Sequence, residues 1–208
     1  MLRSIAVSLV LIVGMSVCAS AQVPNKLVAT GAQYRGGLVN PPMPKPAFVL
    51  TDTSGTRFDF SAQTRGYVTL LFFGYTSCTD TCPMQMFTIA KAFHRLPPGV
   101  ASQFKVVFVT TDPDRDNPTA LRAWLDHFDK RFIGLTGSQQ AIDAAQVAAK
   151  LPVAKKSPPG ADGDYEVDHA AFIMAYSRDG LAHVIYPAGV KEDDWSHDLP
   201  YLAKETWK

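Results

Sequence analysis

The sequence holds little cysteine and no excess of either charge. Its 208 residues include three cysteines, whereas a small protein held together by disulfides needs more. Lysine and arginine total 20 against 19 aspartates and glutamates, and this balance argues against a nucleic-acid binder, which usually carries a basic surface. Hydrophobic residues make up 47% and charged residues 19%, enough for a folded core and contrary to a wholly disordered chain. We therefore expect one folded domain with short extensions.

The first 21 residues have the three parts of a secretory signal. Arg3 supplies the positive charge, an apolar run follows at 5–17, and Ala19-Ser20-Ala21 is a small-residue cleavage site. The apolar run is short for a membrane span. We predict a signal peptide at 1–21, with an uncleaved anchor as the alternative, and hence a periplasmic or otherwise exported protein. Cys18 belongs to this signal, so the mature chain keeps two cysteines in an oxidising compartment.

Apolar runs alternate with helical patterns along the rest of the chain. Residues 22–42 have scattered glycine and proline without periodicity, which predicts an extended lead-in. Strands are expected at 48–50, 57–60, 68–73, 104–109, 132–135, 170–176 and 181–186, with amphipathic helices after the third, fourth and fifth and a partly helical end. Strands and helices alternate first, and a β-hairpin comes last. This order predicts an α/β fold over residues 43–204, with a thioredoxin-like mixed central sheet flanked by helices.

Cys78 and Cys82 lie where a buried strand gives way to a helix. Pro83 lacks an N–H and suits the first helical turn, so Asp80 is the predicted N-cap. Both sulfurs would then lie at the positive end of the helix dipole, which favours thiolate. In a helix, Cα atoms four apart lie about 6 Å from each other, within the range for a disulfide. The pair therefore permits a reversible disulfide or a two-sulfur clamp for a soft metal such as Cu(I), with a permanent structural disulfide as the alternative.

Imidazole is a common further ligand for copper, and the chain has five histidines. His94 and His127 fall on predicted helices among charged neighbours, His197 lies in the polar tail, and His183 lies inside the last strand. His169 differs because it opens an apolar strand, and in a thioredoxin-type fold the loop before this hairpin faces the cysteines. A lone histidine is more often structural, so the residues alone make His169 a candidate and no more.

Four stretches together resemble the Sco/SenC family of copper-binding, thioredoxin-like proteins: FGYTSCTDTCP at 73–83, TDPDRDNP at 111–118, IGLTG at 133–137 and YEVDH at 165–169. The resemblance implies a site for copper, as Cu(I) or Cu(II), made by Cys78, Cys82 and His169, with Asp112 as an acidic residue close to it. It further implies a copper chaperone that supplies the dinuclear copper centre of cytochrome c oxidase, or that keeps the thiols of that centre reduced.

Two other functions stay open at this point. A thiol–disulfide oxidoreductase would use one of Cys78 and Cys82 to attack and the other to resolve. A thiol peroxidase of this fold would carry a proline seven residues before its reactive cysteine, where this chain has Leu71 and Tyr75. The expected partners are a copper-accepting oxidase subunit or another copper chaperone, and a thiol reductant. We expect a monomer that binds no nucleic acid and meets a membrane only through a partner or an uncleaved N-terminus.

Overall fold

The computed structural model describes residues 33–207, so the predicted signal peptide, the alternative anchor and most of the lead-in lie outside the described residues. The strands are β1 (Gly37–Pro44), β2 (Val49–Asp52), β3 (Arg57–Asp59), β4 (Val68–Gly74), β5 (Phe104–Thr110), β6 (Ile133–Thr136), β7 (Lys155–Lys156), β8 (Val167–Asp168), β9 (Phe172–Tyr176) and β10 (Leu181–Pro187). The helices are α1 (Phe60–Gln63), α2 (Thr81–Arg95), α3 (Pro98–Ala101), α4 (Pro118–Asp126), α5 (Gln139–Ala148) and α6 (Glu192–Lys204).

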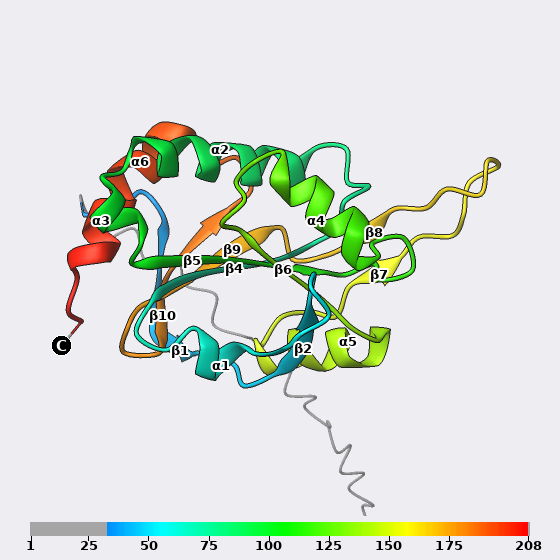
Figure 1. The fold of residues 1–208 in the computed structure, drawn as a ribbon, viewed down its shortest axis with the longest axis horizontal. Helices are drawn as coiled ribbons and strands as arrows, with labels where there is room; N and C mark the ends of the chain where they lie inside the picture. Colours follow the sequence, from blue (N-terminus) through cyan, green and yellow to red (C-terminus); the bar gives the residue numbers. More distant parts are fainter. Residues whose placement is uncertain (1–32, 208) are drawn as a thin grey trace, which may run out of the picture.

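Within this range one eight-stranded sheet has the order β1-β10-β9-β4-β5-β6-β2-β3, and β7 and β8 form a separate small pair. Strands β4, β5 and β6 run parallel, whereas β9 is antiparallel to β4, so the sheet is mixed. Helices α2, α3, α4 and α6 lie on one side of the sheet and α1 and α5 on the other (Figure 1). The predicted thioredoxin-like arrangement is confirmed.

The centre of the sheet forms because β4 and β5 are continuous apolar runs. All seven residues of β4 are buried, as expected of a parallel strand covered on both faces. Side chains alternate between faces: Leu70 and Phe72 join the core under α2, and Leu71 and Phe73 join the core on the opposite side. The carboxyl end of this central strand is where the chain enters the cysteine turn.

The helix boundaries follow local signals in the sequence. Asn117 caps α4, with its side chain accepting the N–H of Ala120 at 2.9 Å and Pro118 at the first helical position. Ser138 caps α5 in the same way through the N–H of Ala141. The predicted helical end is α6, joined to α2 by ion pairs from Lys91 and Arg95 to Glu192. No helix within 33–207 is long and apolar enough to cross a membrane.

The end of the expected lead-in is part of the sheet. Residues 37–44 form β1, an edge strand antiparallel to β10 from Gly37 opposite Ile185 to Pro44 opposite Leu181. Sequence analysis missed this strand because its three prolines hide any alternation, and an edge strand is where a sheet tolerates proline. The segment before β1 is held by the buried Asp198 of α6, which accepts the backbone N–H groups of Arg35 and Gly36.

Candidate metal centre

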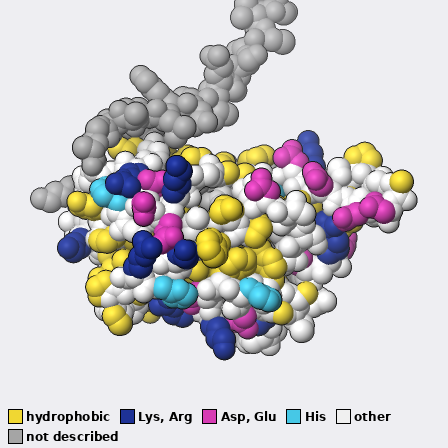
Figure 2. Space-filling model, turned by 90° about the horizontal axis from the view of Figure 1, so that it is seen from above, with side chains coloured by type: hydrophobic (Ala, Val, Ile, Leu, Met, Phe, Trp, Pro, Cys, Tyr) yellow, Lys and Arg dark blue, Asp and Glu magenta, His cyan; other side chains and the backbone are white. Residues whose placement is uncertain are grey.

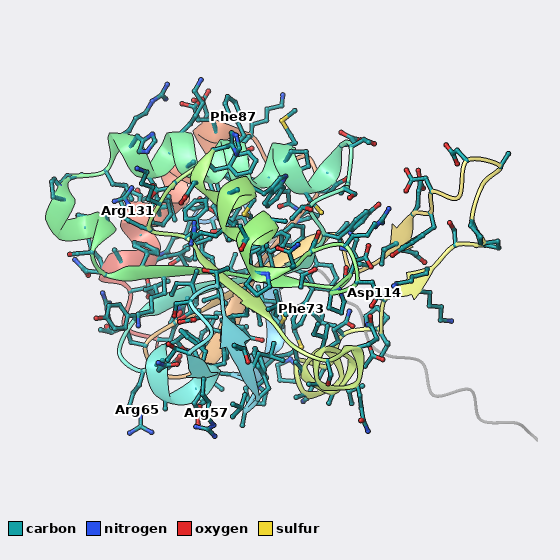
Figure 3. The ribbon with its side chains drawn as sticks, turned by 45° about the vertical axis from the view of Figure 1, so that its right-hand side comes forward. Arg57, Arg65, Phe73, Phe87, Asp114 and Arg131 are labelled. Carbon is teal, nitrogen blue, oxygen red and sulfur yellow. The ribbon has the colours of Figure 1, made fainter. Side chains whose placement is uncertain are left out.

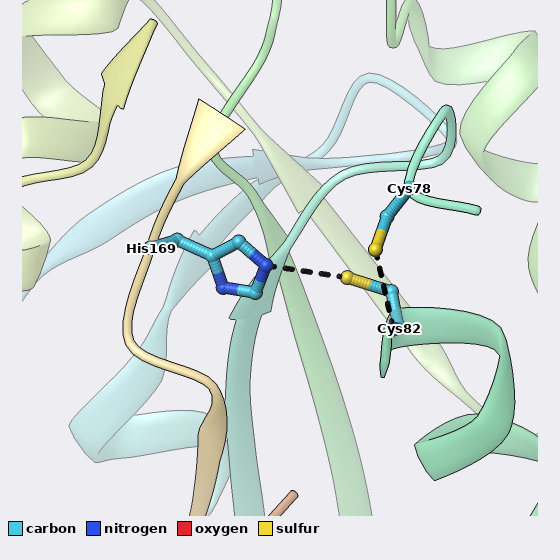
Figure 4. A group of neighbouring side chains, drawn as sticks. All are labelled: Cys78, Cys82 and His169. Atoms are coloured by element: carbon cyan, nitrogen blue, oxygen red, sulfur yellow. Dashed lines mark hydrogen bonds between the residues drawn. The ribbon is translucent and has the colours of Figure 1, made fainter. Parts of the chain in front are cut away.

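Cys78, Cys82 and His169 meet at the carboxyl end of β4 (Figure 4). One ligand atom from each, two Sγ and one imidazole nitrogen, lies within 4.8 Å of the others. The Sγ of Cys82 is 3.5 Å from Nε2 of His169, although 87 positions separate them. Neither cysteine is in a disulfide; Cys82 is fully buried and Cys78 is partly exposed. The structure therefore brings together three of the four residues that sequence analysis named.

The cysteine turn differs from expectation at the start of α2. Asp80 occupies the N-cap position, as predicted, although its side chain accepts no capping hydrogen bond. Instead the Cys82 N–H points to the Sγ of Cys78 at 3.4 Å. The first N–H groups of a helix have no partner inside the helix, and here the sulfur takes the place of a capping oxygen. The turn itself closes when the N–H of Cys78 donates to the Tyr75 carbonyl at 3.3 Å.

Asp116 ties this turn to the neighbouring strand, and sequence analysis did not single it out. It is fully buried and accepts the backbone N–H of Thr76 at 2.9 Å and the hydroxyl of Thr110 at 2.6 Å. Its other oxygen accepts the Thr76 hydroxyl. The signal for it was its place in the 111–118 stretch, but only the fold shows that Thr76, 40 positions away, is its partner. Asp116 thus holds the residues just before Cys78.

The two thiols have opposite acidities. The hydrogen bond from the Cys82 side chain, the N–H groups of Cys82 and Asp80, and the nearby His169 lower the pKa of Cys78 to about 4 despite partial burial. The same hydrogen bond and burial raise the pKa of Cys82 well above its usual range. The prediction that the helix dipole favours both thiolates therefore holds for Cys78 and fails for Cys82, because burial and a neighbouring negative sulfur outweigh the dipole there.

His169 follows β8 and precedes β9, as the sequence predicted. Its Nδ1 lies 3.3 Å from the Ala170 carbonyl. A carbonyl can only accept, so the hydrogen bond requires a proton on Nδ1, and Nε2 faces the Sγ of Cys82. The rings of Phe72 and Tyr75 lie edge-on to the imidazole, with centroids 5.8 and 5.7 Å away. A hydrogen-bonded Nδ1 and a restricted ring are what a metal-binding histidine needs.

The other four histidines lie elsewhere. His94 and His127 are exposed at helix ends, His183 pairs with Asp179 and stacks on Trp207, and His197 pairs with Asp198. The preference for His169 over these residues therefore agrees with the geometry.

Asp112 lies beside the site without touching its sulfurs or imidazole. It is fully buried and takes a hydrogen bond from the Tyr165 hydroxyl at 2.8 Å, ion pairs with Lys156 at 3.1 Å, and bonds to Arg115. Burial would raise its pKa, but the bonds from these three partners lower it overall. Arg115 also lies over the rings of Tyr165 and Tyr75. Asp112 is therefore linked to the site through these neighbours and not by direct contact.

An open groove of about 480 Å³ gives solvent access to the site. Its lining contains Tyr75, Cys78 and His169. It also contains residues of β7, β8 and their neighbours, among them Lys155, Lys156, Glu166 and Asp168. Cys82 does not line the groove. The groove thus opens the site to a partner protein on the side of Cys78 and His169.

The mixed sheet, the cysteine turn before α2 and the histidine before β9 define a thioredoxin-like domain with a two-thiol, one-imidazole centre. The family model described as SCO1/SenC matches residues 40–203, and the chain belongs to that family.

Relatives agree in sequence and in structure. An SCO2-like protein of Rickettsia felis is 32% identical over 151 residues, which are 70% of this chain and 71% of the relative. Apo Sco1 from Thermus thermophilus superposes with a TM-score of 0.71 at 31% identity, over 81% of this chain and 96% of that one. Bradyrhizobium japonicum ScoI, solved with copper bound, superposes with a TM-score of 0.68 at 32% identity, over 77% and 99% of the two chains.

Proposed function

We propose that this protein binds copper through Cys78, Cys82 and His169 and delivers it during assembly of cytochrome c oxidase. The observation that carries the proposal is the convergence of two sulfurs and an imidazole nitrogen within 4.8 Å. Thiolate and imidazole form the donor set that suits copper. The copper-bound Bradyrhizobium japonicum relative supports the metal. BsSco, which shares the fold, is described as a member of the Sco family of cytochrome c oxidase assembly proteins, which supports the role.

The residues have distinct tasks in this function. Cys78 is already a thiolate at neutral pH, because its pKa is about 4, and it faces the groove. Cys82 is protonated and buried, so it must release a proton when it becomes a ligand. His169 offers Nε2 with its proton held on Nδ1 by Ala170. Because a Cys78–Cys82 disulfide could not hold copper, reduction of the pair must come first.

Copper titration of the purified, reduced protein tests the proposal. We expect one copper per chain. His169→Ala should weaken binding by more than the roughly 10- to 100-fold lost with an outer-sphere partner. His127→Ala is the matched control, since His127 is exposed at the end of α4, and it should leave the affinity unchanged. Equal affinity in the His169→Ala variant and the wild type would remove His169 from the site.

A second function has its own observation in the different acidities of the thiols. A partly exposed, acidic thiol beside a buried, protonated one is the arrangement of an attacking and a resolving cysteine. Cys78 would attack a partner's disulfide and release one partner thiol. Cys82 would then lose its proton and attack Cys78, forming the Cys78–Cys82 disulfide and releasing the second thiol. Cys82→Ser should accordingly trap a mixed disulfide through Cys78, and Cys78→Ser should not. His169→Ala separates the two functions, because exchange does not need the imidazole.

The setting of the protein is also part of the proposal. Residues 1–21 would act as an export signal, or as an anchor if uncleaved, and the domain at 43–204 would work outside the cytoplasm as a monomer. An oxidase subunit or another copper chaperone would take the metal, and a thiol reductant would restore the cysteines. N-terminal sequencing of the exported protein should begin at Gln22 if the signal is removed, and at Met1 if it is retained as an anchor.

A further inference from the structure

A buried glutamine lies between the two segments that carry the candidate ligands. Gln85 follows Cys82 by three positions on α2 and is 3% exposed. Its Nε2 donates a hydrogen bond to the carbonyl of Ala171 at 3.2 Å. Ala171 follows His169 by two positions, between β8 and β9. One side chain therefore joins the helix of the cysteines to the stretch of chain that carries the histidine.

The stretch from His169 to Ala171 needs such a link. These three residues belong to no strand, so sheet hydrogen bonds do not determine their position. The contacts of the imidazole with Phe72 and Tyr75 orient the ring against the sheet and the cysteine turn. The bond from Gln85 instead places the backbone of this stretch relative to α2, and thus relative to Cys82.

The other end of the same amide has no partner. Its Oε1 is buried and accepts no hydrogen bond from the described chain. A buried carbonyl without a partner lowers stability, so an apolar side chain of the same length would suit the core better. Residues that go against the demands of packing are expected where function requires them. The hydrogen bond that the Gln85 amide donates to Ala171 is such a functional requirement.

We infer that Gln85 is a positioning residue of the copper site, whose bond to Ala171 sets the distance between the cysteine pair and His169. The inference rests on the proposed copper function. It extends that function to a residue that is not a ligand. Removing an outer partner of a metal ligand typically lowers metal affinity about 10- to 100-fold, and the effect here should lie near the lower end, about tenfold.

The variant Gln85→Met tests this inference, because methionine is similar in length but has neither the donor nor the unpartnered carbonyl. We expect the free energy of unfolding to stay close to that of the wild type, because loss of the bond to Ala171 and removal of the unpartnered carbonyl act in opposite directions. Cu(I) affinity should be about tenfold weaker. In the copper-free protein, the NMR cross-peaks between the His169 ring and the Cys82 side chain should weaken. Gln146→Met is the matched control: Gln146 is buried on α5 with both ends of its amide bonded, to Pro152 and Ala154. It should lose stability and keep its copper affinity.

Several results would overturn the inference. Wild-type affinity and wild-type cross-peaks in Gln85→Met would show that the bond does not set the spacing. Stability and affinity lost together in that variant, or affinity lost equally in Gln146→Met, would indicate a general packing effect. If Gln85→Met does not fold, NMR measurements on the wild-type protein test the inference instead. Its Gln85 amide protons should exchange slowly with solvent and contact Ala171, and fast exchange without that contact contradicts the inference. A wild type that binds no copper would refute the proposed function, while the copper-free cross-peaks would still test the spacing.

Discussion

At the scale of single residues, Gly74 determines how closely Cys82 can approach the sheet. A Cβ on Gly74 would stand 2.8 Å from the Sγ of Cys82 and 3.1 Å from the ring of Phe108. Both neighbours are fully buried in a close-packed core and have little room to move. The Phe-Gly-Tyr sequence before the cysteine turn is therefore a packing requirement of the buried sulfur.

The variant Gly74→Ala should displace that sulfur. We expect a loss of about 1–3 kcal/mol in the free energy of unfolding, as for other overpacked cores, together with weaker copper binding. Urea denaturation and copper titration measure the two effects. Gly99→Ala is the control, since nothing lies within 4 Å of a Cβ placed there. A Gly74→Ala protein with the stability and affinity of the wild type would contradict this account.

At the scale of elements, residues 155–168 form an arm that leads into His169. Strands β7 and β8 make its base, and its tip extends away from the body of the domain (Figure 1). Asp114 lies next to this base (Figure 3) and pairs with Lys156 at 2.6 Å. Arg115 pairs with Asp164 at 2.6 Å, and Tyr165 bonds to Asp112. The loop between β5 and α4 therefore holds the arm and, through it, the histidine.

The variant Asp112→Asn should loosen the arm. It keeps the size of the side chain but removes the buried anion from Arg115 and Lys156, which retain their partly exposed pairs with Asp164 and Asp114. We therefore expect a loss of about 1–3 kcal/mol in the free energy of unfolding. Amide hydrogen exchange should become faster along 155–168, and copper binding should weaken. Asp126→Asn is the control, because it breaks a surface pair with Arg122 on α4 that is worth a few tenths of a kcal/mol. Equal effects of the two variants on hydrogen exchange and copper binding would contradict a role of the buried Asp112 in holding the arm.

At the scale of the whole molecule, the total charge is nearly balanced, and one face shows how the charges are arranged. On the face of α2, α4 and α6, basic and acidic side chains are interspersed around a group of hydrophobic ones (Figure 2), in keeping with 20 basic against 19 acidic residues. Two of the buried carboxylates, Asp112 and Asp129, bear on the pH dependence of stability. Asp112 and Asp129 both have lowered pKa values, the latter because hydrogen bonds from Arg131 outweigh its burial.

These carboxylates predict how stability depends on pH. A group whose pKa is lower in the folded state contributes stability above its unfolded pKa, about 4, and loses it as pH falls through the folded value. The free energy of unfolding should therefore be nearly constant from pH 7 to about 5 with respect to these two groups and fall below about pH 4. Denaturation across this range measures it. The Asp129→Asn variant should be less stable than the wild type at neutral pH and should lose less stability on acidification. If its free energy of unfolding depends on pH as steeply as that of the wild type, Asp129 is excluded as a cause.

Part of this protein follows from the sequence alone. The buried runs of β4 and β5, the capping Asn117 and Ser138, and the cysteine turn before a helix are local patterns, and local physics is enough to predict them. The likeness of four short stretches to one family then selected His169 from five histidines and named Asp112.

The tertiary structure decided the rest, because each remaining feature depends on residues distant in the chain. Burial and a shared hydrogen bond made Cys78 acidic and kept Cys82 protonated, whereas the sequence predicted two similar thiols. The sheet edge admitted the proline-rich β1. The bond from Gln85 to Ala171 and that from Thr76 to Asp116 join segments 86 and 40 positions apart. No local pattern specifies such contacts, because they exist only once the core has packed.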